Sequence, residues 1–390
     1  MKRLFSSRLL TGGDLEVISR LSEGLIILSI ILSVCLGGCH LPAVEGDFGR
    51  PTAEDLIFYL YKVVCGPVAR EYKERPVELS QSESTKTFTL SVFGDIMFKH
   101  SLERFEDIYK EVPEELLESD FVFGNIEFPI DQSVPTSGFP RFNASVSYFE
   151  KIVLPLRLSV ASIANNHCLD KGADGFIATK VLLEERGILA LGGTFPDRFS
   201  LVEIDGITVA FSAYTFGTNG RSDLYNLVNV ARLNSIGLDD NSIDSLMETV
   251  REMSRAADVV ILSLHWGLEH EITPSPNQVR LAHNLCDEGV DLIVGHHPHV
   301  LQPIESYRNS RDKSSLIIYS LGNWTTAMRN SSCRISSPLK LEVSSYGEVV
   351  SIEAFPFILD LERNRFLPKR DNEDIPLSIA TFSYWKGEHR

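Results

Sequence analysis

The sequence predicts an α/β fold whose functional residues gather at one edge of a sheet. From residue 87 onward, short runs rich in β-branched and aromatic residues alternate with helical stretches, which is typical of α/β layers. An acid, an amide or a histidine follows each of five predicted strands. In an α/β sheet the carboxyl ends of the strands gather on one edge, where ligands bind.

The composition is that of an acidic globular protein. The chain has 390 residues, 43% of them apolar and 23% charged, which suits one large domain or two ordinary ones with a buried core. Its 37 basic and 53 acidic residues give a formal net charge of −16, so we expect no nucleic-acid partner. The six cysteines are too few and too scattered for a disulfide scaffold or a cysteine-based zinc module.

Residues 1–44 predict a signal or anchor segment. Four basic residues precede an uncharged stretch, residues 25–44, in the layout of a secretory signal. Residues 36–39 resemble a lipobox, which would make Cys39 a lipidation site, and the stretch also reaches the length of a spanning helix. A buried helix of a soluble protein is the third alternative. Either anchor places the body on the extracytoplasmic face of the cell membrane.

The rest of the chain divides near residues 86 and 360. Residues 45–86 predict a stalk with a short helix within 52–64, residues 87–360 the main domain, and residues 361–390 a C-terminal tail. Helices are expected at 173–186, 242–257 and 277–288, and a β-rich run at 337–358. Strands are expected at 87–93, 121–123, 158–163, 188–191, 207–214, 259–264, 292–294 and 316–320.

The residues after the strands form a set of nitrogen and oxygen donors. Such a set suits a divalent ion such as Mn, Zn or Fe, and it lacks the thiolates of a structural zinc cage. Singly, each residue has a structural alternative as a turn, a cap or a core histidine, but five strand ends together favour one site. His297 and His299 are the sharpest pair, because an extended segment points side chains i and i+2 the same way.

Six motifs in order carry a family resemblance. They are GDIMF (94–98), NIEFP (125–129), ANNHCLDKG (164–172), HWGLEHE (265–271), GHHPHVLQPIE (295–305) and YSLGNW (319–324). The sequence resembles the CapA family of poly-γ-glutamate capsule synthesis proteins over residues 88–324. That family is similar to the calcineurin-like metallophosphoesterases, which implies a two-layer β-sandwich flanked by helices.

The resemblance also implies roles for single residues. His167 matches the catalytic histidine that contacts the substrate, whereas Asn125, Glu269 and Asn323 would support the ligands or face the substrate. Met97 stands where the phosphoesterases have a histidine ligand, and a thioether binds hard ions weakly, so we expect one or two ions with one position weakened. The implied metal ligands are Asp95, Glu127, Asn166, His265, His297 and His299.

These inferences predict a membrane-tethered extracytoplasmic protein of capsule synthesis. It would act in poly-γ-glutamate synthesis, export or anchoring through a metal site, with the membrane and the capsule polymer or its synthase complex as partners. The alternative is an active metal-dependent hydrolase, a phosphoesterase or amidase, on another cell-envelope substrate. A third alternative is a degenerate fold that serves only as an interaction module.

Overall fold

The computed structural model describes residues 59, 61–63, 65–80, 86–105, 108–194, 198–234 and 241–383. The predicted segment 1–44, with Cys39, lies outside these residues. Of the helix expected within 52–64, residues 59 and 61–63 are described, and they are helical. Among the described residues, no helix combines the length and the apolar character that a bilayer crossing requires.

The first of two large sheets is built around β1. On one side β1 pairs in parallel with β2, and on the other it pairs with antiparallel β13 and then, at its end, with parallel β11. The sheet runs β14-β13-β1-β2-β3-β4. Its strands are β1 (Thr87–Ile96), β2 (Phe121–Ile126), β3 (Val160–Ser162), β4 (Leu189–Leu191), β11 (Asn323–Thr325), β13 (Leu339–Ser344) and β14 (Val349–Ala354).

The second sheet has four parallel strands between two antiparallel edge strands. Its order is β5-β6-β7-β8-β10-β9, in which only β5 and β9 run against their neighbours. The inner strands β7 and β8 are buried throughout, as continuous apolar runs predict. The strands are β5 (Ser200–Ile204), β6 (Ile207–Thr215), β7 (Val259–His265), β8 (Leu292–His296), β9 (Ile304–Arg308) and β10 (Ser314–Ile318).

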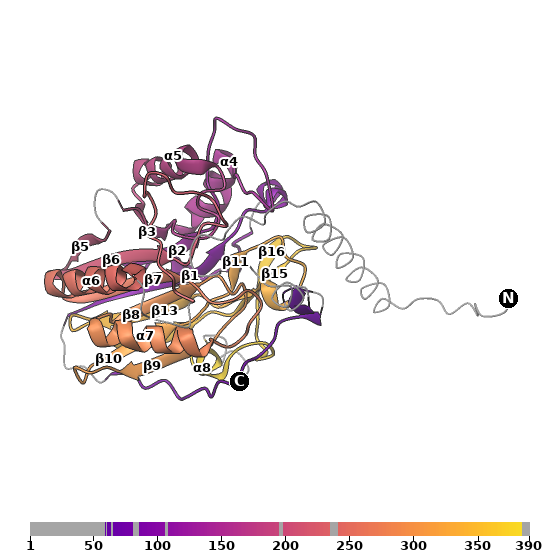
Figure 1. The fold of residues 1–390 in the computed structure, drawn as a ribbon. Coiled ribbons are helices and arrows are strands. Elements are labelled where there is room, and N and C mark those ends of the chain that lie inside the picture. The colour runs from indigo at the N-terminus through magenta and orange to yellow at the C-terminus, as the bar shows by residue number, and fades with distance from the viewer. Residues whose placement is uncertain are drawn as a thin grey trace, which may run out of the picture.

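The two sheets share one hydrophobic core. Alternate residues of the second sheet point inward, where the ring of Phe211 meets that of Phe121 of the first sheet edge to face at 5.2 Å. The intervening residues of the second-sheet strands point outward and pack under α6 (Asn241–Ala256) and α7 (Pro276–Glu288). Figure 1 shows both helices over the second sheet, with α5 (Gly172–Glu185) beside the first. The predicted two-layer α/β architecture with flanking helices is confirmed.

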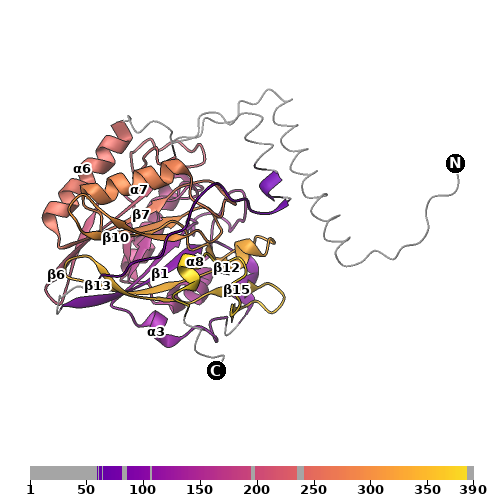
Figure 2. The same ribbon diagram turned by 90° about the horizontal axis from the view of Figure 1, so that it is seen from below.

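Short elements complete the body. Figure 2 shows α3 on the side of the sheets opposite α6 and α7, and Figure 1 shows α8 beside β9. The hairpin of β15 and β16 crosses the expected boundary at residue 360. These elements are β12 (Ile335–Ser336), β15 (Phe357–Asp360), β16 (Arg365–Pro368), α3 (Glu114–Leu117), α4 (Val146–Tyr148), α8 (Leu377–Ala380), the 3-10 turns η1 (His100–Arg104), η3 (Leu154–Leu156) and η4 (Ser332–Arg334), and the π-turn η2 (Phe149–Val153).

The segment after the expected anchor is held to the second sheet by a buried ionic cluster. Glu271 accepts from Lys62 Nζ at 3.2 Å and from the guanidinium of Arg70. Val68 forms a β-bridge with Glu271, and the backbone N–H of Glu78 donates to the hydroxyl of Ser306. The part of the expected stalk that is described therefore lies against the body.

Candidate metal centre

The register of both sheets places the candidate ligands at one edge. In the first sheet Asp95 is the Cα partner of Asn125 on β2 and of Asn323 on β11. In the second sheet His265, the last residue of β7, is the partner of His296, the last of β8. Parallel strands that end together therefore bring residues about two hundred positions apart to the same edge.

A close backbone approach fixes Asp95. The N–H of Asp95 donates to the carbonyl of Gly322 at 2.9 Å, across the β1 to β11 step. A Cβ on the preceding residue, Gly94, would collide with that carbonyl oxygen, so this position requires glycine. The Asp95 carboxylate in turn accepts from the backbone N–H of His297 at 3.1 Å, which ties the first sheet to the loop after β8.

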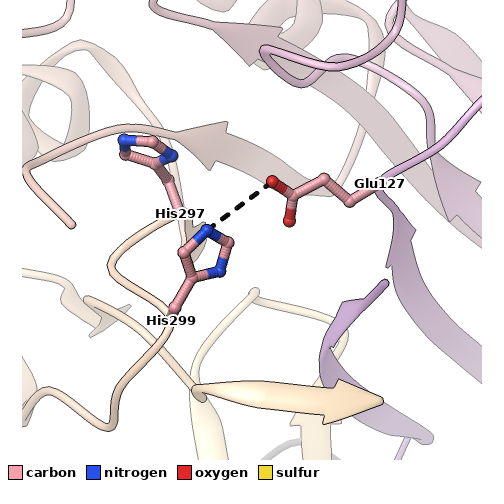
Figure 3. Close-up of side chains that lie close together, drawn as sticks. All are labelled: Glu127, His297 and His299. Carbon is pink, nitrogen blue, oxygen red and sulfur yellow. Dashed lines mark ion pairs between the residues drawn. The ribbon is translucent and has the colours of Figure 1, made fainter. Parts of the chain in front are cut away.

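Two overlapping groups of side chains have the geometry of a cation site. In one, ligand atoms of Glu127, His297 and His299 all lie within 4.8 Å of one another, and in the other those of Asp95, Glu127 and His265 do. Figure 3 shows the Glu127 carboxylate facing His299 with His297 beside it. The Glu127 Oε1 atom lies 3.8 Å from His299 Nε2 and 3.6 Å from His265 Nε2. Glu127 therefore belongs to both groups, as a bridging carboxylate would.

Glu127 has the environment of a candidate metal ligand. The side chain is wholly buried, and neither carboxylate oxygen has a hydrogen-bond partner. The Nδ1 atom of His297 is also buried without a partner. Leaving a buried carboxylate unpaired costs several kcal/mol, roughly, unless a cation compensates it. The donor set of carboxylates and imidazoles fits a divalent cation, and the buried group suggests divalent metal binding.

The titration of these groups follows from burial and from one another. Burial, and then the carboxylate of Asp95, raise the pKa of Glu127 well above its usual value, although His299 opposes this. Burial would raise the pKa of Asp95 too, but its contacts with His296 and His299 hold that pKa well below the usual value. Burial likewise disfavours charge on His299, yet Glu127 and Asp95 raise its pKa to about 10. A cation at His299 would therefore have to displace a proton.

Amide side chains orient the ligands. The Nδ1–H of His299 donates to Asn323 Oδ1 at 2.9 Å, and the Asn323 amide group donates to the carbonyls of His299 and Cys333. This contact directs the Nε2 atom of His299 toward Glu127. Asn125 donates to Asp95 Oδ1 at 2.9 Å and lies 3.4 Å from His265 Nδ1, so it links two members of the second ligand group across the two sheets.

Asn166 and His167 lie at the rim of the ligand groups. Asn166 Oδ1 accepts from His265 Nε2 at 3.0 Å. The His167 Nδ1 atom lies 2.8 Å from Asp170 Oδ2. From the other sheet, Asn219 accepts from the Asn166 amide at 3.2 Å and lies 3.5 Å from His167 Nδ1. The sequence pattern missed Asp170, although its i, i+3 spacing from His167 was visible, and Asn219, for which there was no signal.

The backbone of the His297-Pro298-His299 segment differs from the expectation. The two histidines do meet at one site, with ring centroids 5.7 Å apart. The expected extended backbone is wrong, because φ is +97° at His297 and +59° at His299, in the left-handed region. Such a conformation is costly for residues with a Cβ and is held by the surrounding contacts, among them the Asp95 hydrogen bond to the His297 N–H.

Three more residues surround the ligand groups. His296, which the resemblance leaves outside the ligands, has Nδ1 at 2.9 Å from Asp95 Oδ1. The Met97 sulfur accepts from the Thr326 hydroxyl at 3.7 Å. Glu269 lies at the edge of the site, where it accepts from the Tyr59 hydroxyl at 3.2 Å.

The comparison with protein families decides the relationship. The model of the family described as bacterial capsule synthesis protein PGA_cap matches residues 89–327. The chain belongs to this family. The matched segment runs from β1 to the residues after β11, so this PGA_cap segment holds every candidate ligand described above. The family resemblance expected from the six motifs is confirmed.

Three bacterial relatives of this chain have names that refer to PGA, capsule or polyglutamine synthesis. The chain is 30% identical to PGA biosynthesis protein CapA of Bacillus subtilis over 258 residues, 62% of this chain and 64% of that one. It is 30% identical to capsule biosynthesis protein CapA of Bacillus anthracis over 275 residues, 66% and 63% of the two chains. A probable polyglutamine synthesis accessory protein of Mycobacterium tuberculosis is 30% identical over 165 residues, 39% of this chain and 42% of that one. The alignments thus span less than two thirds of the relatives' lengths.

Solved structures with a similar backbone trace include a phosphatase and a nucleotidase. A phosphatase from Mycoplasma pneumoniae has a TM-score of 0.47 at 12% identity, over 70% of this chain and 94% of that one. A 5'-nucleotidase precursor from Thermus thermophilus has a TM-score of 0.40 at 13% identity, over 72% and 56% of the two chains.

Proposed function

We propose that this chain acts in poly-γ-glutamate capsule synthesis, export or anchoring through a cation site built on Glu127. Membership of the PGA_cap family supports the pathway, because the matched residues 89–327 carry the whole candidate site. The names of the two Bacillus relatives refer to capsule or PGA biosynthesis. The carrying observation is the buried Glu127 carboxylate without a hydrogen-bond partner, shared by both ligand groups.

The cation gives an acidic protein a means of holding an acidic polymer. At a formal charge of −16 the chain as a whole repels a carboxylate-rich ligand. A bound Mn, Zn or Fe ion would neutralise negative charge and polarise a substrate oxygen. Asp95, Glu127, His265, His297 and His299 would hold it, and Asn166 would join through its contact with His265.

The proposed location is the outer face of the cell membrane. The uncharged residues 25–44, preceded by basic residues, support a signal or anchor segment, and Cys39 would carry the lipid if the segment is a lipobox. The intact mass of the mature protein separates the alternatives: cleavage before Cys39 with a lipid adduct supports the lipoprotein, and an uncleaved chain supports the spanning anchor.

Complementation tests the capsule role. The gene is expressed in a poly-γ-glutamate-producing Bacillus that lacks its own CapA relative, and surface polymer is measured. We expect the native chain to restore polymer, Glu127→Gln to fail, and the exposed control Glu203→Gln on β5 to behave as the native chain. Unchanged polymer on expression of the folded, membrane-located native chain would refute the proposed role.

A second candidate, a metal-dependent hydrolase, is favoured by the His167–Asp170 pair. An aspartate at 2.8 Å from Nδ1 orients the imidazole and leaves Nε2 to hold or donate a proton at the reacting bond. The test is hydrolysis of phosphodiester and γ-glutamyl substrates with added manganese or zinc. Turnover no higher than that of His297→Ala would eliminate this candidate.

A further inference from the structure

Two loops from different sheets contact His167. The β2 loop, residues 131–145, follows the strand that leads into Glu127, and its Phe142 ring packs edge-on against the His167 ring at 4.6 Å. The β6 loop, residues 216–234, follows β6 and places Asn219 at 3.5 Å from His167 Nδ1. Its first residue, Phe216, packs against the His297 ring at 4.6 Å. Both loops are thus parts of the wall of the candidate site.

The same loops carry the most exposed apolar side chains of the described part of the chain. Leu224 is 82% exposed, Phe139 is 78% exposed and Tyr225 is 73% exposed, and no other large apolar residue described is as exposed as these. Single exposed apolar residues are common on protein surfaces, but these three lie on the two loops that contact His167, next to the candidate site.

The two loops together are slightly basic within an acidic chain, with three arginines (Arg141, Arg221 and Arg232) against two aspartates. Each loop has one acid, and both acids are used internally: Asp131 accepts from the Ser133 N–H and hydroxyl, and Asp223 accepts from two N–H groups of its own loop. Arg141 is exposed on the β2 loop, and Arg221 is partly exposed on the β6 loop. Against a net charge of −16, these loops offer a local surface for carboxylates.

We propose that the β2 and β6 loops form a binding track for an extended polyanion whose carboxylates are separated by methylene groups. This chemistry is that of poly-γ-glutamate, so the inference rests on the proposed function and extends it. Arg141 and Arg221 bind carboxylates, which the guanidinium fork fits. Phe139, Leu224 and Tyr225 cover the methylene segments between them. The chain of the polymer thereby passes His167 and the cation site.

Binding of fluorescent poly-γ-glutamate to the full chain, loaded with manganese, tests the track by anisotropy. Arg141→Ala with Arg221→Ala removes the charges, and Phe139→Ser with Tyr225→Ser removes the apolar contacts. We expect each pair to weaken binding by about tenfold, with the charge pair also flattening the salt dependence. Unchanged melting temperatures establish that the variants fold, since all four side chains lie at the surface.

Matched variants elsewhere are the controls. Arg363→Ala on the β15–β16 turn and Tyr346→Ser on the β13–β14 turn, both exposed, should leave binding unchanged. If the native chain binds the polymer and the loop variants bind it equally well, the track is refuted while the capsule role stands. If the native chain binds hyaluronan instead of poly-γ-glutamate and the loop variants lose it, the proposed polymer is refuted.

A membrane surface is the alternative binding partner for loops that carry apolar and basic side chains. Vesicles of phosphatidylglycerol with phosphatidylcholine provide that arm of the test. Loss of vesicle binding by the loop variants, with polymer binding intact, would overturn the inference in favour of a lipid contact. Loss of polymer binding with vesicle binding unchanged supports it.

Discussion

Glu127→Gln removes the side chain that both ligand groups share and keeps its size. In the wild type a cation would pair with a carboxylate that has no other partner, whereas the amide supplies one neutral oxygen. We therefore expect the substitution to abolish stabilisation by added Mn²⁺ or Zn²⁺. In the chelated protein we expect Glu127→Gln to be more stable than the wild type above pH 4.5. The raised pKa of buried Glu127 lowers the stability of the wild type as the pH rises above 4.5, whereas glutamine does not titrate.

The size of the effect follows from binding linkage. A free cation at 100 times its dissociation constant stabilises the folded state by about 2.7 kcal/mol. A folded body of roughly 300 residues has an unfolding entropy near 0.6 kcal/mol/K, so its melting temperature rises by about 4 °C. We expect this rise in the wild type and less than a quarter of it in Glu127→Gln.

Scanning fluorimetry after chelation, with each metal added back, measures the shift. Glu203→Gln, an exposed substitution of the same chemistry, is the matched control and should respond as the wild type does. A Glu127→Gln variant that keeps the full metal-dependent shift would refute the assignment of Glu127 as a shared ligand. A wild type that gains no stability from any of Mn²⁺, Zn²⁺ or Fe²⁺ would refute the cation site itself.

Three further outcomes follow from single contacts. Asp170→Asn should lower hydrolysis less than His167→Ala and shift its pH profile, because it changes the orientation of the imidazole and keeps the ring; equal losses with no shift would contradict this. Burial lowers the pKa of His270 to about 4, so stability present above pH 6.5 is lost as the pH falls toward 4. His270→Gln should remove about 1.4 kcal/mol per pH unit of that slope, measured by urea unfolding. Glu271→Ala removes the carboxylate that pairs with buried Lys62 and with Arg70 and should cost about 3 kcal/mol, whereas Glu271→Gln should cost less.

The strands of the sheets were predictable where burial on both faces requires a continuous run of apolar residues. Strands β7 and β8 are buried on both faces, so their residues form continuous apolar runs. The predicted ends of these two strands therefore lie close to the observed ends. The edge strands β5 and β9 were missed because a half-exposed antiparallel edge mixes polar and apolar residues, as SLVEI of β5 does.

The candidate ligands were predictable because each lies at the end of a strand or within a few residues after it. The pairing of Asp95 with residues of β2 and β11 depends on register, which local sequence does not reveal. Asn219 reaches His167 from the other sheet, so only the packing of the two layers brings it there. The left-handed backbone of His297 and His299 was not predictable either, because residues with a Cβ normally adopt negative φ angles.

The division of donors between the two layers has a consequence for how the protein matures. Asp95, Glu127 and Asn166 offer oxygens from the first layer, and His265, His297 and His299 offer nitrogens from the second. A partly folded chain in which only one sheet layer has formed would present half of the proposed ligands and would bind an ion weakly. With the proposed ligand set, tight cation binding would require both layers to have packed together, so ion retention would report on the completion of folding.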